Sequence, residues 1–158
     1  MNFEEVEQKV RAALSRLREE DKLLIQANTN ERTISHKLAE HLKKEFSPML
    51  EVDCEYNRHG VEIKRLNVPI GGHGWDNTEA KMVVPDIVVH QRKNDNNNLL
   101  VIEVKKSSNA RNRQFDEDKL TAFAKEPYRY SFGLLLEVSM NTTDDSLTWY
   151  ENGHVKNE

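Results

Sequence analysis

Residues 83–107 (VVPDIVVHQRKNDNNNLLVIEVKKS) form two apolar runs on either side of a polar, asparagine-rich segment. Short apolar runs bounded by turn-forming residues are typical of strands buried in a sheet. Each run nevertheless carries ionisable residues, with Asp86 after a proline in the first run and Glu103 and Lys105 in the second. A fold that buries these strands must therefore accommodate two carboxylates and an ammonium group, and an unpaired charge is costly to bury.

The spacing of the two runs predicts a β-hairpin closed around residues 92–97. In an antiparallel pair of that register, Asp86 lies opposite Glu103, and the Cβ atoms of opposed residues are about 5 Å apart. Because side chains alternate between the two faces of a strand, Lys105 shares the face of Glu103. The other face is apolar and is expected to line the core, with Ile87, Val89, Leu100, Ile102 and Val104.

The pair of carboxylates predicts a metal site. Two carboxylates this close inside a protein repel each other strongly unless a proton or a cation lies between them. Mg²⁺ prefers carboxylate, carbonyl and water oxygens, and one or two carboxylates typically hold it. Asp86 and Glu103 are therefore predicted to bind Mg²⁺, for which Mn²⁺ is expected to substitute. The alternative is a structural ion pair, in which Lys105 bridges the two carboxylates of an otherwise inert domain.

A third carboxylate, Glu31, belongs to a helix that is predicted to begin after an N-cap at Thr29 or Asn30 and to stop at Pro48. At about 100° per residue, Glu31 falls in the middle of the apolar stripe of this helix, which contains Ile34, Leu38, Leu42 and Phe46. Glu31 is therefore predicted to point toward the element on which the helix packs. A purely structural role stays open, because an acidic residue in the first turn also complements the helix dipole.

The remaining patterns predict an α/β fold with a mixed central β-sheet flanked by helices, in a single domain of 158 residues. Residues 67–81 hold three of the six glycines and predict a long, mobile loop. The other predicted elements are a helix over 2–20, a half-exposed strand over 50–58, a helix over 116–127, a strand over 131–139 and a hairpin over about 147–156, with Asn-Gly at its centre.

The sequence resembles the motif of the PD-(D/E)xK, or restriction-endonuclease-like, nuclease superfamily. The motif begins with the proline-aspartate pair that ends at Asp86, and after a spacer of sixteen residues it closes with the triplet EVK that ends at Lys105. The resemblance implies an αβββαβ core over about 31–139, with an extra N-terminal helix and a C-terminal hairpin. One feature departs from the subfamilies related to the RecB nucleases. These carry a Gln-x-x-x-Tyr pattern on the helix after the motif, which residues 116–127 lack.

In this superfamily, the aspartate and glutamate of the motif bind Mg²⁺, and the lysine orients or activates the attacking water. Many members add a glutamate on the first core helix, which Glu31 matches. The resemblance therefore implies that Asp86, Glu103 and Glu31 bind the metal and that Lys105 completes the catalytic site. It implies an endo- or exonuclease that hydrolyses phosphodiester bonds, with DNA favoured over RNA. The alternative is a nuclease-fold module that binds nucleic acid or a partner subunit without hydrolysis.

Several further residues are candidates for contacts with phosphate. Ser107, Arg111 and Arg113 directly follow the motif and could track a nucleic-acid backbone, although a solvated charged loop is the alternative. Lys119 lies near the edge of the apolar face of the next helix and is a weaker candidate. A homodimer or a larger nuclease or defence complex is consistent with the resemblance.

Charge and cysteine content limit the other classes of function. The net charge of −4 argues against a broad basic surface for non-specific nucleic-acid binding, but it leaves room for a local basic groove. A lone cysteine, Cys54, excludes an internal disulfide and a cysteine-based zinc cluster. No run approaches the roughly 18 apolar residues of a membrane span, and no secretory signal is visible. We therefore expect a cytoplasmic protein without a membrane contact.

Overall fold

The computed structural model of the chain describes residues 1–56, 58–59, 62–63, 65–69, 78–82, 84–92, 94–109 and 113–156. The helices are α1 (Phe3–Glu20), α2 (Lys22–Gln26), α3 (Glu31–Phe46) and α4 (Arg113–Phe123), with a 3₁₀ turn at Asp95–Asn97. The strands are β1 (Glu51–Cys54), β2 (Arg58–His59), β3 (Glu62–Ile63), β4 (Arg65–Pro69), β5 (Thr78–Met82), β6 (Ile87–His90), β7 (Leu100–Lys106), β8 (Phe132–Val138), β9 (Ser146–Glu151) and β10 (His154–Val155).

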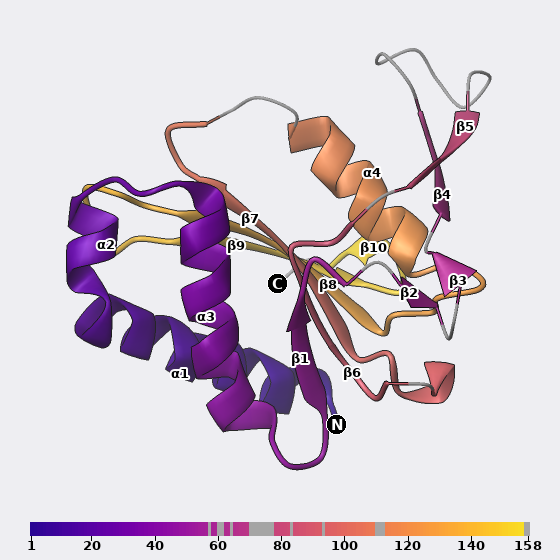
Figure 1. The fold of residues 1–158 in the computed structure, drawn as a ribbon, viewed down its shortest axis with the longest axis horizontal. Helices are drawn as coiled ribbons and strands as arrows, with labels where there is room; N and C mark the ends of the chain where they lie inside the picture. The colour runs from indigo at the N-terminus through magenta and orange to yellow at the C-terminus, as the bar shows by residue number, and fades with distance from the viewer. Residues whose placement is uncertain are drawn as a thin grey trace.

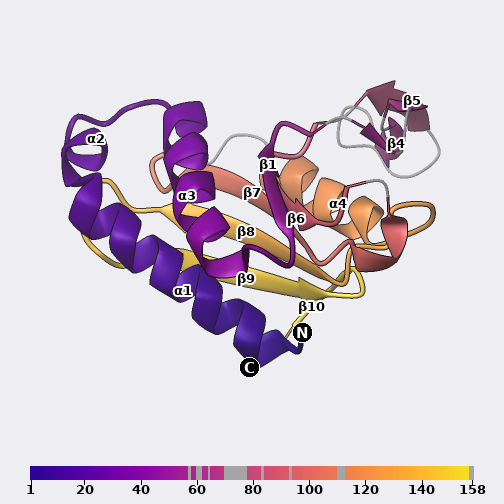
Figure 2. The ribbon, with the colours of Figure 1, turned by 60° about the horizontal axis from the view of Figure 1, so that its bottom comes forward.

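The described strands include a six-stranded mixed sheet in the order β1-β6-β7-β8-β9-β10 (Figure 1). Neighbouring strands are antiparallel except β7 and β8, which run parallel and are connected through α4. Helices α1 and α3 lie over one face of the sheet and α4 lies over the other (Figure 2). This arrangement confirms the predicted α/β class with a mixed central sheet flanked by helices.

The register of the β6–β7 hairpin is the one that the sequence predicts. Val88 lies opposite Val101, and Ile87 lies opposite Ile102. Asp86 directly precedes the first residue of β6, so the same register places it opposite Glu103 at the end of the ladder. The asparagine-rich segment closes the hairpin through a 3₁₀ turn, in which the side chain of Asn94 accepts a hydrogen bond from the backbone N–H of Asn96.

Apolar side chains pack on both faces of the sheet, and the alternation along β6 and β7 decides which face each one joins. One cluster joins α1 and α3 to the face predicted to line the core, which carries Ile87, Val89, Leu100, Ile102 and Val104. The opposite face carries Val88 and Val101, which pack with Leu120 and Phe123 of α4. Glu103 and Lys105 of β7 lie on this second face, under α4.

Local signals account for the ends of several elements. Helix α1 begins with a capping box formed by Asn2 and Glu5. Asn30 is the N-cap of α3, and its side chain accepts a hydrogen bond from the backbone N–H of Thr33 at 2.8 Å. The C-terminal hairpin turns at Asn152 and Gly153, which both have positive φ, of 52° and 81°. Positive φ at both central residues is the requirement of the type I′ turn that Asn-Gly predicts.

Two predicted elements have different bounds in the structure. Strand β1 ends at Cys54 rather than near residue 58, because Glu55 adopts a positive φ of 47° that breaks the extended backbone. Helix α4 begins three residues earlier than predicted, at Arg113, whose guanidinium pairs with Glu117 one turn later. It also ends earlier, at Phe123, whose carbonyl accepts a hydrogen bond from Tyr130 N–H as the chain turns back toward β8.

The predicted loop over residues 67–81 is partly wrong. Residues 67–69 belong to β4 and residues 78–81 belong to β5, and the two strands pair antiparallel. Strand pairing uses backbone groups, and the polar sequence TEAK lacks the apolar alternation from which strands are predicted. Residues 70–77 lie outside the described residues. None of the helices in the described ranges combines the length and apolar character needed to cross a membrane.

Candidate active site

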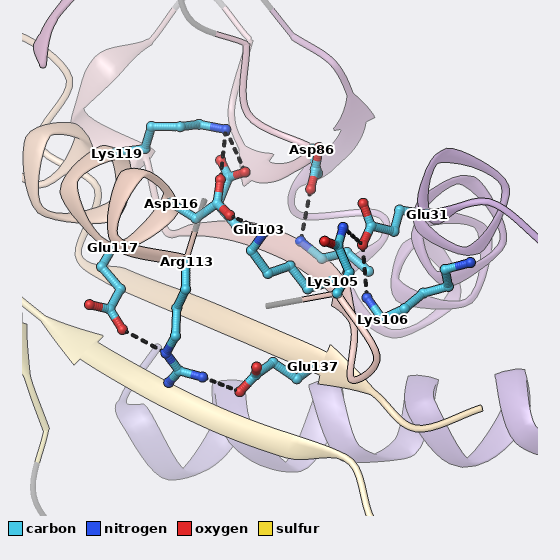
Figure 3. Close-up of polar contacts among 12 residues, drawn as sticks. Glu31, Asp86, Glu103, Lys105, Lys106, Arg113, Asp116, Glu117, Lys119 and Glu137 are labelled. Atoms are coloured by element: carbon cyan, nitrogen blue, oxygen red, sulfur yellow. Dashed lines mark hydrogen bonds and ion pairs between the residues drawn. The ribbon is translucent and has the colours of Figure 1, made fainter. Parts of the chain in front are cut away.

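The four predicted site residues, Glu31, Asp86, Glu103 and Lys105, line one pocket of about 440 Å³ between α3, the start of β6, the end of β7 and α4 (Figure 3). Two distant parts of the sequence thus contribute to it, α3 on one side and the consecutive elements β6, β7 and α4 on the other. Its lining consists of Glu31, Asp86, Glu103, Val104, Lys105, Asn109, Phe115, Asp116 and Lys119.

Asp86 is held by the backbone of the neighbouring strand. Its Oδ2 accepts a hydrogen bond of 2.8 Å from the N–H of Val104, and its carbonyl accepts one from the N–H of Glu55. Burial raises the pKa of the Asp86 carboxyl above its ordinary value, against the lowering effects of the Val104 N–H and the Lys119 charge. The Val104 N–H therefore orients a carboxyl group whose ionised form is disfavoured.

Glu103 is the most deeply buried carboxyl group of the pocket, with 2% of the residue exposed. Its Oε2 lies 2.5 Å from the ammonium nitrogen of Lys119. Its Oε1 is fully buried and has no hydrogen-bond partner among the described residues. Burial raises the pKa of Glu103 well above its ordinary value, and the nearby charge of Asp86 adds to this rise. Glu103 thus combines one oxygen that contacts an ammonium with a second oxygen that has no partner among the described residues.

Lys105 is buried beside Glu103 on β7, and it forms an ion pair of 2.8 Å with Asp116 of α4. The alternative interpretation of the sequence places Lys105 as a bridge between Asp86 and Glu103. In the structure it is Lys119, also from α4, whose ammonium lies against Glu103. Helix α4 therefore supplies a charged partner both to the glutamate and to the lysine of the motif.

The sequence did not lead us to expect Asp116 in the site, nor the pairing of Lys119 with Glu103. Asp116 and Lys119 are both buried on the inner side of α4, with Leu120 and Phe123. A signal was present, because positions 116, 119, 120 and 123 follow the i, i+3, i+4, i+7 spacing of one helical face. The prediction counted only apolar residues on that face and so missed the acidic member of the stripe.

Glu31 faces β7, as its position in the apolar stripe of α3 predicts. Its Oε1 accepts hydrogen bonds from the backbone N–H of Lys106 at 3.0 Å and from the side-chain amide of Asn109 at 2.9 Å. These bonds tie the first turn of α3 to the end of β7. Asn109 is a further residue of the pocket that the sequence did not reveal, since it lies in an irregular segment without periodicity.

The remaining candidates for phosphate contacts lie in different surroundings. Lys119 lines the pocket, but its ammonium is engaged by Glu103. Arg113 pairs with Glu117 at 3.0 Å and with Glu137 at 2.5 Å. Ser107 is exposed, and its backbone N–H donates to the carbonyl of Val138. Arg111 lies outside the described residues.

The pocket suits a divalent cation in its charge and in its oxygen donors. It carries four carboxyl groups and two ammonium groups, which leaves two excess negative charges when all are ionised: Glu31, Asp86, Glu103 and Asp116 against Lys105 and Lys119. Hard cations such as Mg²⁺ select carboxylate oxygens, and the buried Oε1 of Glu103 is an unsatisfied one. Among the described residues, however, no three His, Cys, Asp or Glu side chains lie close enough together to hold an ion. Binding would therefore require the carboxylates to converge.

No protein-family model, no curated protein and no solved structure matches this chain. The likeness to PD-(D/E)xK nucleases consequently rests on the motif around Asp86 and Glu103 and on the order of the elements. Helix α3, the strands β1, β6 and β7, helix α4 and strand β8 follow one another as an αβββαβ series. The described parts of β2 to β5 form two small two-stranded sheets inserted between β1 and β6.

Proposed function

We propose that this chain is a Mg²⁺-dependent nuclease of the cytoplasm that hydrolyses phosphodiester bonds in DNA. One observation carries the proposal: Glu31, Asp86 and Glu103, which come from separate parts of the chain, line a single pocket together with Lys105. Buried carboxyl groups with raised pKa values are unfavourable for stability, and they are common at functional sites. The αβββαβ order of the elements supports the same conclusion.

The groups that would hold Mg²⁺ are the carboxylates of Asp86 and Glu103, with Glu31 completing the set. When bound, Mg²⁺ supplies the Lewis acid for phosphodiester hydrolysis and neutralises negative charge on the phosphate. The Val104 N–H orients Asp86, because it holds Oδ2 at 2.8 Å. Asn109 and the N–H of Lys106 orient Glu31 in the same way.

Lys105 is the group that would orient the attacking water and stabilise the negative charge that develops on the phosphate. Its ammonium has a defined position, because it lies 2.8 Å from Asp116 and is buried between β7 and α4. A charged donor that is already held in place costs little reorganisation during a reaction. Asp116 therefore belongs to the proposed site as the residue that positions Lys105.

A second candidate function is a nuclease-fold module that binds nucleic acid or a partner subunit without cleaving it. The ion pairs Lys119–Glu103 and Lys105–Asp116 favour this alternative, because they compensate buried charges without any metal. A homodimer or a larger complex is compatible with either function.

A cleavage assay separates the two functions. Labelled single-stranded, duplex and branched DNA, and RNA of the same sequence, are incubated with the full chain and Mg²⁺ or Mn²⁺. We expect cleavage of DNA that EDTA abolishes and that Lys105→Ala lowers about 100-fold or more. Lys22→Ala, which changes an exposed lysine of α2, is the matched control and should leave cleavage unchanged. Nucleic-acid binding without cleavage under all these conditions would favour the module, and cleavage that survives both EDTA and Lys105→Ala would contradict the proposed site.

A further inference from the structure

The ammonium of Lys119 lies between two carboxyl groups. It is 2.5 Å from Oε2 of Glu103 and 3.8 Å from Oδ1 of Asp116 (Figure 3). All three residues are buried, with 6% of Lys119, 2% of Glu103 and 9% of Asp116 exposed. A buried carboxylate needs a positive partner, and a partner removed without replacement leaves an uncompensated charge. Lys119 therefore supplies the positive charge that Glu103 needs in the absence of a metal.

A divalent cation at Glu103 would compete with this ammonium. Two positive charges that share one carboxylate repel each other, and inside a protein the repulsion is only weakly screened. Oε1 of Glu103 is the oxygen without a partner in the described residues, so it is the atom available for a first contact with a cation. Oε2 becomes available only if Lys119 withdraws.

Asp116 offers the ammonium of Lys119 a second carboxylate with which to pair. The two oxygens of Asp116 face different lysines, since Oδ2 lies 2.8 Å from Lys105 and Oδ1 lies 3.8 Å from Lys119. If the distance between Lys119 and Oδ1 shortened, Lys119 would form a close ion pair with Asp116. Lys105 would keep its own ion pair with Oδ2. The ammonium of Lys119 would then stay buried and compensated without Glu103.

We propose that Lys119 is an internal cation that occupies Glu103 in the metal-free protein and transfers its ammonium to Asp116 when a divalent cation binds. This inference rests on the metal site of the proposed function. It assigns to α4 control over metal affinity, because a cation can use both oxygens of Glu103 only after Lys119 has left Oε2. It also explains how the pocket keeps buried carboxylates compensated before the metal arrives.

Calorimetric titration of the full chain with Mn²⁺ and with Mg²⁺ tests the exchange. Lys119→Met removes the competing ammonium and is expected to tighten metal binding on the order of tenfold. Lys106→Met is the control, because it removes a neighbouring ammonium at the end of β7 that donates to the side chain of Asn28 at 3.0 Å. The control is expected to change the affinity markedly less. Lys119→Gln, which keeps a donor for Glu103 without the charge, replaces Lys119→Met if that variant fails to fold.

Equal tightening in the two methionine variants would mean that the lysines act only through net charge, and this would overturn the exchange. Metal binding that is unchanged or weaker in Lys119→Met would overturn it as well. A second measurement follows the ¹⁵N resonances of the lysine ammonium groups in the wild-type protein during the Mg²⁺ titration. We expect the Lys119 resonance to shift more than that of Lys105. Absence of metal binding in every variant would overturn both the site and the exchange, whereas exchange without DNA cleavage would contradict only the nuclease.

Discussion

The carboxylate of Glu31 accepts a hydrogen bond of 3.0 Å from the backbone N–H of Lys106, 75 residues away in the sequence. This bond joins the first turn of α3 to the end of β7. Lys106 directly follows Lys105 and lies three residues after Glu103 on the same strand. The side-chain amide of Asn109 donates to the same oxygen at 2.9 Å. Glu31 thus fastens one wall of the pocket to another in the metal-free protein.

Replacement of Glu31 by alanine should destabilise the protein. The change leaves two partly buried donors without their acceptor, and hydrogen bonds to a charged group contribute about 1.5–3 kcal/mol each. We therefore expect the free energy of unfolding, measured by urea denaturation in EDTA, to fall by about 2 kcal/mol or more. Glu31→Gln keeps one acceptor oxygen and should lose less.

Glu4→Ala is the control for the helix dipole. Glu4 is an exposed acidic residue in the first turn of α1, and Glu31 occupies the first turn of α3. If the dipole alone explained Glu31, both alanine variants would lose a similar amount, of about 0.3–1 kcal/mol. Equal losses of that size would contradict the role of Glu31 as a link between α3 and β7.

Replacement of Asp86 by asparagine should leave the metal-free protein equally stable or more stable. The pKa of Asp86 is raised, mainly by burial, so its ionised form opposes folding at neutral pH. Asparagine can still accept the Val104 hydrogen bond through its amide oxygen. Thermal melts at pH 7 in EDTA would measure the effect. A loss of about 3–5 kcal/mol would instead indicate that Asp86 is half of a structural ion pair.

The geometry of the hairpin was predictable because two short-range patterns agree there. Alternation assigns Val88 and Val101 to one face, and the asparagine-rich turn sets which residues oppose each other. A change of register by one residue would exchange the two faces, so the core itself selects the observed pairing. The position of Glu31 was predictable for a similar reason, since the apolar stripe of α3 determines its orientation.

The partners of the charged residues were not predictable in the same way. Lys119 lies near two carboxylates, Glu103 and Asp116, and Lys105 pairs with Asp116, so the rotation of α4 on the sheet decides these pairings. That rotation is set by packing of Leu120 and Phe123 against both Val88 and Val101, which is a tertiary contact. Strand β5 escaped prediction because its sequence TEAKM lacks apolar alternation, and β4 offers only the short alternation of Leu66 and Val68.

Asp53 should show the pH dependence opposite to that of Asp86. Burial acts to raise the pKa of Asp53, but hydrogen bonds from Arg92 and His90 outweigh it, so the pKa is lowered. The stabilisation from this carboxylate is therefore present above its ordinary pKa of 3.8 and is lost as the pH falls through the lowered value. Asp53→Asn should lower the free energy of unfolding at pH 7 by about 1–3 kcal/mol.

Urea denaturation of wild type and Asp53→Asn across the acid range would test this sign. The difference between the two proteins should shrink as the pH falls below the ordinary range of aspartate. Asp144→Asn, which changes an exposed aspartate after β8, is the control and should show little difference at any pH. A difference that grows toward acid pH would contradict the lowered pKa of Asp53.

Glu103 should show the strongest link between metal and stability. Its pKa is raised well above the ordinary value of 4.5, chiefly by burial, so the metal-free protein loses stability as the pH rises through and beyond the ordinary range of glutamate. A cation that binds only the folded state should offset this loss, by about 2.7 kcal/mol at about 100 times its Kd. Thermal melts with Mg²⁺ and with EDTA should therefore diverge as the pH rises, because protons compete with the cation for Glu103. Glu103→Gln should abolish this divergence between the Mg²⁺ and EDTA melts. The control Asp144→Asn should preserve it. A Mg²⁺ effect that survives Glu103→Gln would place the cation elsewhere on the protein.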